Sequence, residues 1–417
     1  MGKTSYTTLI TLILFLTFCP HLHLCSKTLK VGRGYTCHTI SQALAIAAPH
    51  DVILVAPGTY KERLSIRKPI TLKGIGMPVV DGTCSGHVIS VLADSVIIDG
   101  LMLINSARSS YKEFCGVLIK ECTGVVIKNN IFRDNSYSIL LQHSNRCVIQ
   151  NNKISTSIDE LTLLGNAIHC WKCDSISITD NQVGRHRDGI YLEFVTHSNI
   201  MRNTVNGCLR YGLHFMFSHY DTYYGNRFAR NVAGVAVMYS HHIHMSCNTF
   251  EQNRGESSYG LLLKEISDGT ISNNTFRSNT IGIFMDSATN LYLKRNIFRE
   301  NGWGMRVVGS STNNVVTNNN FVGNTFDIST NSTYNSNMFD ANYWDKYQGY
   351  DLDKDGIGDV PYHPLSLFSA LVEVNPTMML FFHGFIMNLL DKSEKILPSI
   401  TPDTFKDNSP LIHAIRL

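Results

Sequence analysis

Two methionines and three histidines stand at matching positions of neighbouring repeats in the middle of the chain. Met216 and Met238 are 22 residues apart, and His219 and His241 follow each of them at the same spacing. A further imidazole, His214, lies two residues before Met216. Thioether sulfur with imidazole nitrogen suits copper(I), whereas calcium and magnesium take oxygen ligands. One interpretation of these five residues is therefore a patch that binds copper(I) transiently.

The same residues have two other interpretations. A surface methionine often serves only in packing, and a methionine-rich surface can bind a protein without any metal. A protein-docking surface and a chance coincidence of residue types therefore stay open beside the copper site.

An aspartate-rich segment near the C-terminus is the second candidate for metal chemistry. Its start has the D-x-D-x-D-G pattern of a calcium loop, in which alternate carboxylates converge and Gly356 makes the turn. The twelfth position is Tyr362 rather than a bidentate acid, so the segment is not an EF-hand. A calcium site and a plain Asp/Gly-rich turn both remain possible interpretations of the four carboxylates, which are Asp351, Asp353, Asp355 and Asp359.

Glycan chemistry is the catalytic alternative. A polyuronate lyase or epimerase needs two or three carboxylates close together, or an arginine base beside acids. The best match is the run Arg185–Asp188 together with Glu193, which is mixed in sign and has no second acidic cluster one repeat away. We therefore predict no catalytic residue and treat enzymatic activity as the alternative to a binding role. The sequence also contains no phosphate-binding glycine loop, so any ATP-driven role requires a partner.

A repeated motif predicts the secondary structure that must position these residues. Asn-x-Phe/Ile/Val returns about every 22 residues, and a fixed period of this size indicates stacked structural repeats. Each repeat holds two or three short runs of alternating pattern, which predicts one coil of an all-β, right-handed parallel β-helix. The asparagines should stack as an inward ladder between coils. The motif begins at Asn130, Asn152, Asn181, Asn203, Asn226, Asn248, Asn274, Asn296 and Asn319.

Alternation within three aligned repeats assigns the two faces of the strands. The apolar pairs that should face the core are Ile190/Leu192, Leu213/Phe215 and Val235/Val237. The pairs that should face outward are Tyr191/Glu193, His214/Met216 and Ala236/Met238, preceded by His169/Trp171. Coils sit ~4.8 Å apart, so the sulfurs of Met216 and Met238 should be separated by roughly twice a metal–sulfur bond of ~2.3 Å.

The chain divides into five segments. Residues 1–26 read as a secretory signal, because Lys3 precedes an apolar run from Leu9 to Phe18 that is too short to span a bilayer. Residues 27–100 form an N-terminal cap with one short helix at 39–48 and the first coils. Residues 101–340 are the repeat body, 341–364 an Asp/Gly-rich loop, and 365–417 an apolar C-terminal helical tail. Within the tail, 377–390 could cap the solenoid or dock on a membrane protein.

Charge and cysteine content bound the partners and the compartment. A formal charge of +3 and the lack of a basic run exclude a nucleic-acid partner on charge grounds. Nine cysteines remain after the signal, an odd number that leaves at least one thiol unpaired in an oxidising compartment. Cys170 and Cys173 form a C-x-x-C pair without a βαβ context, which favours structural over redox cysteines.

Several longer phrases carry a resemblance to a known family. The most specific are 187–194, 211–219, 234–241, 259–266 and 342–347, and the segment 349–369 extends them. Through these phrases the chain resembles the NosD family, the periplasmic maturation factors of nitrous oxide reductase. The resemblance implies a fold of stacked coils and a role in assembling the copper–sulfide site of that reductase. It further implies a periplasmic location and three partners: a membrane ABC transporter with permease and ATPase, a copper-delivering lipoprotein, and nitrous oxide reductase itself. The resemblance does not assign the copper ligands.

Overall fold

The computed structural model describes residues 26–158, 160–332, 334–381, 384 and 405–416. The predicted signal, residues 1–26, lies almost entirely outside this range, and so does most of the predicted tail helix at 377–390. Within the described residues, no helix combines the length and the apolar character needed to cross a bilayer.

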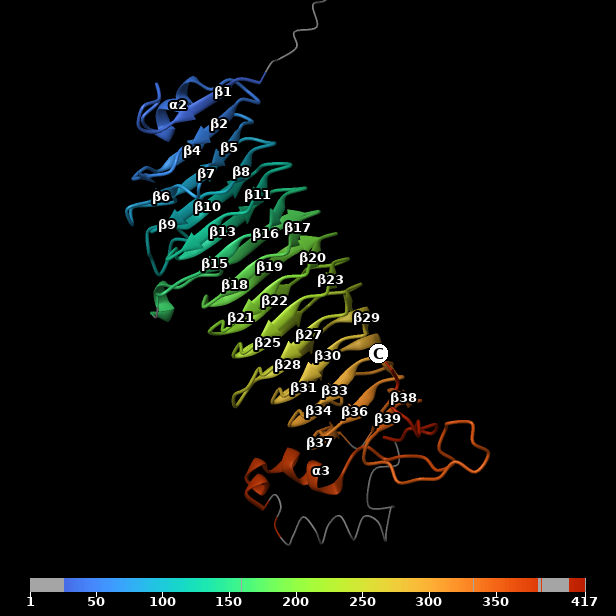
Figure 1. Cartoon of the computed structure of the whole chain (residues 1–417). Coiled ribbons are helices and arrows are strands. Elements are labelled where there is room, and N and C mark those ends of the chain that lie inside the picture. The colour runs from blue at the N-terminus through green and yellow to red at the C-terminus, as the bar shows by residue number, and fades with distance from the viewer. Residues whose placement is uncertain (1–25, 159, 333, 382–383, 385–404, 417) are drawn as a thin grey trace, which may run out of the picture.

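The described chain winds into a parallel β-helix whose coils stack along one axis (Figure 1). Every named strand pairs in parallel with the strand one coil away, in three sheets that we call A, B and C. Sheet A has 14 strands, in the order β1 (Thr28–Val31), β2 (Val52–Val55), β5 (Thr71–Gly74), β8 (Ile97–Asp99), β11 (Val126–Lys128), β14 (Val148–Gln150), β17 (Ser177–Thr179), β20 (Asn199–Met201), β23 (Thr222–Tyr224), β26 (His244–Ser246), β29 (Ser267–Ser272), β32 (Thr289–Lys294), β35 (Val315–Thr317) and β38 (Met338–Asp340).

The other two sheets follow the same coil order. Sheet B has 13 strands: β3 (Thr59–Tyr60), β6 (Val79–Asp81), β9 (Met102–Ile104), β12 (Ile131–Arg133), β15 (Lys153–Ser155), β18 (Gln182–Gly184), β21 (Thr204–Asn206), β24 (Arg227–Ala229), β27 (Thr249–Glu251), β30 (Thr275–Arg277), β33 (Ile297–Arg299), β36 (Asn320–Val322) and β39 (Tyr343–Trp344). Sheet C has 12 strands: β4 (Leu64–Ile66), β7 (Ile89–Val91), β10 (Cys115–Lys120), β13 (Tyr137–Gln142), β16 (Ile168–Asp174), β19 (Asp188–Thr196), β22 (Tyr211–Met216), β25 (Ala233–Met238), β28 (Tyr259–Lys264), β31 (Ile281–Asp286), β34 (Trp303–Val307) and β37 (Phe326–Ser329).

Helices are few and sit beside the coils. The predicted N-terminal helix is confirmed as α2 (Ile40–Ile46), which Thr39 caps through a capping box with Gln42. The other helices are α3 (Leu367–Val374) and two short 3₁₀ turns, η1 (Leu161–Leu163) and η2 (Pro376–Phe381). Helix α3 lies against β37, where Phe368 and Val372 pack with Phe326.

The core is built from columns of identical side-chain types, as the repeat predicts. The residues assigned to the core in β19, β22 and β25 are completely buried. Below them the aromatic residues of sheet B stack from coil to coil, with ring centroids 4.2–5.6 Å apart. This column consists of Phe228, Phe250, Phe276, Phe298, Phe321 and Trp344.

The predicted asparagine ladder is confirmed and runs through ten coils, from Asn130 to Asn342. Each side-chain Nδ2 donates to the Oδ1 of the asparagine in the next coil, at 2.9–3.2 Å. Each backbone amide in the ladder donates to the same Oδ1 atom. The buried corner of each of these ten coils is thereby hydrogen-bonded to the next.

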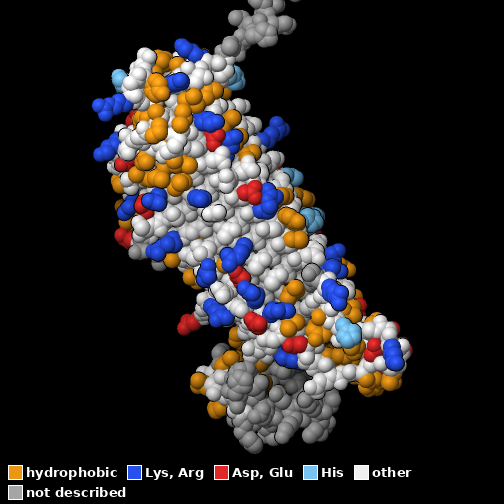
Figure 2. All heavy atoms as spheres, in the orientation of Figure 1, with side chains coloured by type: hydrophobic (Ala, Val, Ile, Leu, Met, Phe, Trp, Pro, Cys, Tyr) orange, Lys and Arg blue, Asp and Glu red, His pale blue; other side chains and the backbone are white. Residues whose placement is uncertain are grey.

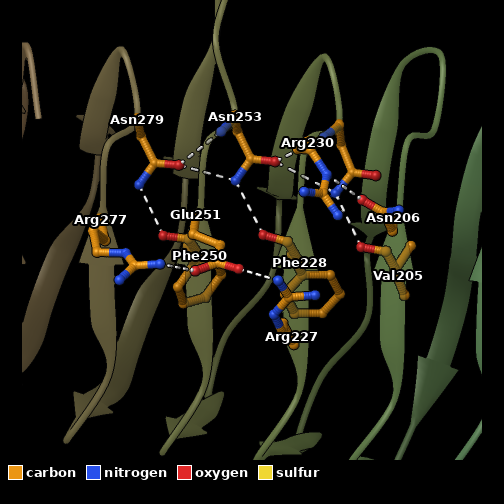
Figure 3. A network of polar contacts seen from close by, with 11 residues as sticks. Val205, Asn206, Arg227, Phe228, Arg230, Phe250, Glu251, Asn253, Arg277 and Asn279 are labelled. Atoms are coloured by element: carbon orange, nitrogen blue, oxygen red, sulfur yellow. Dashed lines mark hydrogen bonds and ion pairs between the residues drawn. The ribbon is translucent and has the colours of Figure 1, made fainter.

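A second asparagine ladder lies in the turns that come after the strands of sheet B (Figure 3). It runs from Asn231 to Asn324, with Nδ2–Oδ1 distances of 3.0–3.4 Å. Beside it, Glu251 is flanked by Arg227 and Arg277 from the neighbouring coils, and forms an ion pair with each. Because the ladders and the ion pairs join successive coils, they hold the stacking register on which any surface column depends.

Candidate functional site

Met216 and Met238 come together as predicted. Met216 of β22 pairs directly with Met238 of β25, and both side chains are half-buried on the outer face of sheet C. The hydroxyl of Tyr191 lies 3.9 Å from the sulfur of Met216. The two sulfurs therefore come from adjacent coils on one surface of the molecule.

His219 and His241 also share a column, in the turn that leads from sheet C to sheet A. Their rings stack with centroids 3.8 Å apart and planes 11° apart. The backbone amide of His241 donates to Nδ1 of His219 at 3.2 Å. This column lies three residues beyond the methionines on each coil, in the turn that follows β22 and β25. We call Met216, Met238, His219 and His241 the His–Met corner.

A third histidine, His242, joins the corner and was not predicted from the sequence. Nδ1 of His242 lies 2.9 Å from Nδ1 of His241. His242 ends a stacked column of its own with His197 and Tyr220, whose centroid distances are 5.2 Å and 4.8 Å. The sequence does carry this signal, because the three residues recur at the repeat spacing, one position after Thr196, His219 and His241.

The surroundings of His219 favour its neutral imidazole. Burial lowers the pKa of His219, and the neighbouring His241 and His242 lower it further. Neutral imidazole is the form that binds a metal, so His219 stays available as a ligand below the usual pKa of histidine.

His214 lies on the predicted outer face, two residues before Met216, but its side chain is buried. Only 6% of it is exposed, and its ring is held against Tyr191 and Tyr211 at centroid distances of 5.0 Å and 4.8 Å. Its Nδ1 lies 3.8 Å from a carboxylate oxygen of Asp188. The two tyrosine rings thus cover the imidazole, which the alternation of the strand alone does not reveal.

The residues considered for glycan chemistry do not form a pair of free carboxylates. Asp188 is completely buried and accepts two hydrogen bonds from Arg210. Burial raises the pKa of Asp188, but its pairing with Arg210 outweighs this and leaves the pKa below its usual value. Glu193 accepts a hydrogen bond from Tyr191 at 3.3 Å. His186 points into the core, where burial lowers its pKa to about 3 and Ser138 Oγ lies 2.9 Å from its Nε2.

The aspartate-rich segment forms a turn held by its own amides. Carboxylate oxygens of Asp351, Asp353 and Asp355 lie within 4.8 Å of one another. Asp351 accepts from the amide of Gly356 at 3.0 Å, and Asp359 accepts separately from Leu352 at 2.8 Å. These bonds are those of an Asp/Gly-rich turn, and calcium at this loop stays a prediction.

Seven of the nine cysteines in the described part of the chain are buried, as is typical of structural residues, whereas Cys84 and Cys247 are exposed. All nine in the described part of the chain are free thiols, and Cys170 and Cys173 are both buried. Burial raises the pKa of Cys170 well above its usual value and that of Cys173 to about 11. Both side chains are therefore thiols rather than reactive thiolates at neutral pH.

Comparison with known proteins relates this arrangement to one family. Residues 155–349 match the family model described as "Periplasmic copper-binding protein (NosD)", a range that contains the whole His–Met corner. The chain is 25% identical over 379 residues to the "Probable ABC transporter binding protein NosD" of Pseudomonas aeruginosa, covering 86% of this chain and 87% of that protein. It is 24% identical over 375 residues to the protein of the same description from Stutzerimonas stutzeri, covering 85% of each.

Solved structures show the same fold in proteins of very different sequence. The catalytic unit of the GH87 alpha-1,3-glucanase from Streptomyces thermodiastaticus superposes with a TM-score of 0.58 at 15% identity, over 73% of this chain and 66% of that one. A point mutant of the periplasmic alginate epimerase AlgG gives 0.52 at 14% identity, over 69% of this chain and 78% of that one. These likenesses establish a shared β-helix and nothing about activity. The resemblance to NosD proteins is thus confirmed, with a NosD domain at its centre.

Proposed function

We propose that this chain, which carries the NosD domain, is a periplasmic accessory factor in the maturation of nitrous oxide reductase and holds copper(I) transiently at the His–Met corner. The description of the matching family supports copper as the cargo. The observation that carries the proposal is the direct pairing of Met216 with Met238 beside the stacked imidazoles of His219 and His241.

The donor set of the corner fits a transient copper(I) carrier. Thioether and neutral imidazole are soft to intermediate ligands that select copper(I) over hard cations. The corner lies on the outer surface, where a partner protein can reach it, and its residues are half-buried rather than enclosed. Two thioethers without a thiolate hold copper weakly enough to hand it on, which suits delivery better than storage.

The partners that we infer follow from the same assignment. The two NosD relatives are described as ABC transporter binding proteins, which supports an association of this chain with a membrane permease and its ATPase. We further infer that a copper-delivering lipoprotein loads the corner and that nitrous oxide reductase receives the metal. The predicted apolar segment 377–390, most of which lies outside the described residues, is the segment that we assign to the permease.

The copper site is tested by removing its two sulfurs. In the Met216→Leu/Met238→Leu variant, the affinity for copper(I) should fall at least tenfold in competition with a chromogenic copper(I) chelator. Leucine conserves the volume of methionine, so the thermal midpoint should change little. The matched control is Met102→Leu/Met201→Leu, which removes two half-buried methionines from sheets B and A. Equal copper(I) affinity in the two double variants would contradict the proposal that Met216 and Met238 bind copper.

A further inference from the structure

Positive charge is concentrated in the first coils of the solenoid. Residues 26–80 contain eight lysines or arginines against two acidic residues, whereas the whole chain contains 36 against 33. We call this part of the molecule the basic end. Its cationic residues are Lys27, Lys30, Arg33, Lys61, Arg63, Arg67, Lys68 and Lys73, of which all except the half-buried Lys68 are exposed.

The two acidic residues of the basic end leave it a formal charge of +6, and both are held by backbone amides. Asp51 accepts from the backbone amides of Lys27 and Ala48, both at 2.8 Å. Glu62 accepts from the amides of Ile40 and Ser41, both at 2.9 Å, and so caps the first turn of α2. Within the described range, none of the eight cationic side chains forms an ion pair with a carboxylate. The basic end therefore presents its charge to the surroundings.

A groove lies within the basic end, between α2 and β4, the first strand of sheet C. It has a volume of about 480 Å³, an apolar floor that includes Leu44, Ile66 and Ile70, and three cationic residues on its walls. Lys68 donates to the carbonyl of Ala47 at 2.7 Å at the end of α2. Arg67 and Ser65 also line the groove, and both are exposed. Such a groove suits a phosphate group attached to an apolar body.

Apolar side chains project from the same end of the molecule. Ile46 at the end of α2 is 62% exposed, Ile75 is 50% exposed, and Tyr35 is 41% exposed. The ammonium group of Lys30 lies 5.7 Å from the centre of the Tyr35 ring. Apolar and cationic side chains are interspersed over the N-terminal coils in Figure 2. Protruding isoleucines among cations are typical of surfaces that contact a bilayer, where the apolar group enters below the headgroups.

We propose that the basic end docks on a lipid bilayer that carries anionic headgroups, with a headgroup phosphate in the groove beside Arg67. Charge complementarity and the projecting isoleucines favour this surface over an acidic protein, which would need the charge but not the apolar groups. This docking is independent of the copper site, which lies many coils away in β22 and β25 (Figure 1).

The test is co-sedimentation of the full chain with vesicles of phosphatidylcholine, with and without phosphatidylglycerol. Each Lys or Arg near an anionic surface contributes about a fivefold gain in binding, so reversing three such charges should weaken binding by more than about 100-fold. The variant is Arg33→Glu/Arg67→Glu/Lys73→Glu. Its control is Arg133→Glu/Lys153→Glu/Arg299→Glu, which reverses three exposed charges on sheet B and changes the net charge equally.

We expect the native chain and the control to bind vesicles with phosphatidylglycerol and to be released by added salt, while the basic-end variant loses this difference. Binding to pure phosphatidylcholine measures whatever the N-terminal segment contributes and should be equal in all three proteins. Equal binding of the two variants, or no preference for phosphatidylglycerol, would overturn the proposal. At matched ionic strength, free inorganic phosphate and chloride should release the protein from the vesicles equally well. The reason is that the charged bilayer surface as a whole supplies most of the attraction. Release by phosphate alone would instead assign the groove to a soluble phosphate compound and overturn the bilayer assignment.

Discussion

Asp221 is the residue whose protonation most clearly links structure to pH. It is completely buried, it accepts from the amide of Ser198 at 2.8 Å, and burial raises its pKa to about 8. Because the folded state binds this proton more tightly than the unfolded chain, the contribution of Asp221 to stability is complete below pH ~4. That contribution is lost progressively as the pH rises through about 8.

Replacing Asp221 with asparagine should therefore flatten part of the pH dependence of stability. The amide keeps an acceptor for Ser198 but cannot ionise, so Asp221→Asn should gain stability relative to the native chain between pH 5 and pH 8. Thermal midpoints at the two pH values measure this gain. The idea fails if the native chain and the variant lose the same number of degrees over that interval.

Copper binding at the corner should depend on pH through its imidazoles and not through its sulfurs. Because the pKa of His219 is lowered, the ring stays neutral somewhat below pH 6.5, and copper(I) affinity should hold to that point before protons compete. In the His219→Gln/His241→Gln variant, the residual affinity from Met216 and Met238 should be lower and nearly independent of pH. A chelator competition series from pH 5 to pH 8 checks this. An unchanged acid limb in the variant would exclude both histidines as ligands.

At the scale of an element, the long asparagine ladder is the feature that joins one coil to the next. In its middle, Oδ1 of Asn248 accepts from both the amide and the side chain of Asn226, at 2.9 and 3.0 Å. Its Nδ2 donates to Tyr223 O at 2.9 Å and to Asn274 Oδ1 at 3.0 Å. Removing this one side chain leaves buried polar groups unsatisfied in two neighbouring coils.

Asn248→Ala should consequently be strongly destabilising. Each buried group left without a partner costs about 1–3 kcal/mol, and several are affected at once. Urea unfolding of Asn248→Ala, compared with the exposed Asn199→Ala on β20, measures the difference. A loss below about 1 kcal/mol for Asn248→Ala would show that the ladder contributes register without contributing stability.

The periodicity of the sequence predicts the coils, the two faces of each strand and the shared columns, because every coil repeats the same geometry. The pairing of Met216 with Met238 and the stacking of His219 on His241 follow from that spacing. Periodicity does not predict how far a neighbouring side chain reaches, so the burial of His214 under two tyrosine rings was not foreseen. Periodicity also does not predict contacts made by residues outside the repeats, such as the hydrogen bonds of Asp407 to the last asparagine of the ladder, Asn342.

At the scale of the whole molecule, a solenoid has two open ends whose unpaired strand edges invite association with other chains. Helix α2 lies beside the first strands and covers one end. At the other end the C-terminal segment 405–416 returns to the last coil. It adds bridges from Asp407 to Phe339 of β38 and from Leu411 to Tyr343 of β39, each spanning 68 residues of the chain. The two edges that would otherwise be open in sheets A and B are thereby paired.

Asp407 completes the asparagine ladder as its last acceptor. Its carboxylate is completely buried and accepts from the amides of Ala341 and Asn342, at 3.1 and 2.9 Å. It also accepts from the side chain of Asn342 at 3.1 Å and from the indole of Trp344 at 3.0 Å. One carboxylate therefore serves four donors that the last full coil would leave unpaired, a number that only a group with two acceptor oxygens can match.

Removal of this closing segment should change both stability and association. Truncation after residue 404 should increase self-association relative to the full chain, measured by size-exclusion chromatography with light scattering, because the edges of β38 and β39 become available for pairing. Asp407→Ala should lower the urea midpoint more than Asp407→Asn, since asparagine keeps one acceptor oxygen and alanine keeps none. If the truncated chain has the same stability and the same oligomeric state as the full chain, the end of the solenoid is protected by α3 and not by Asp407. The two point variants would then be equally stable.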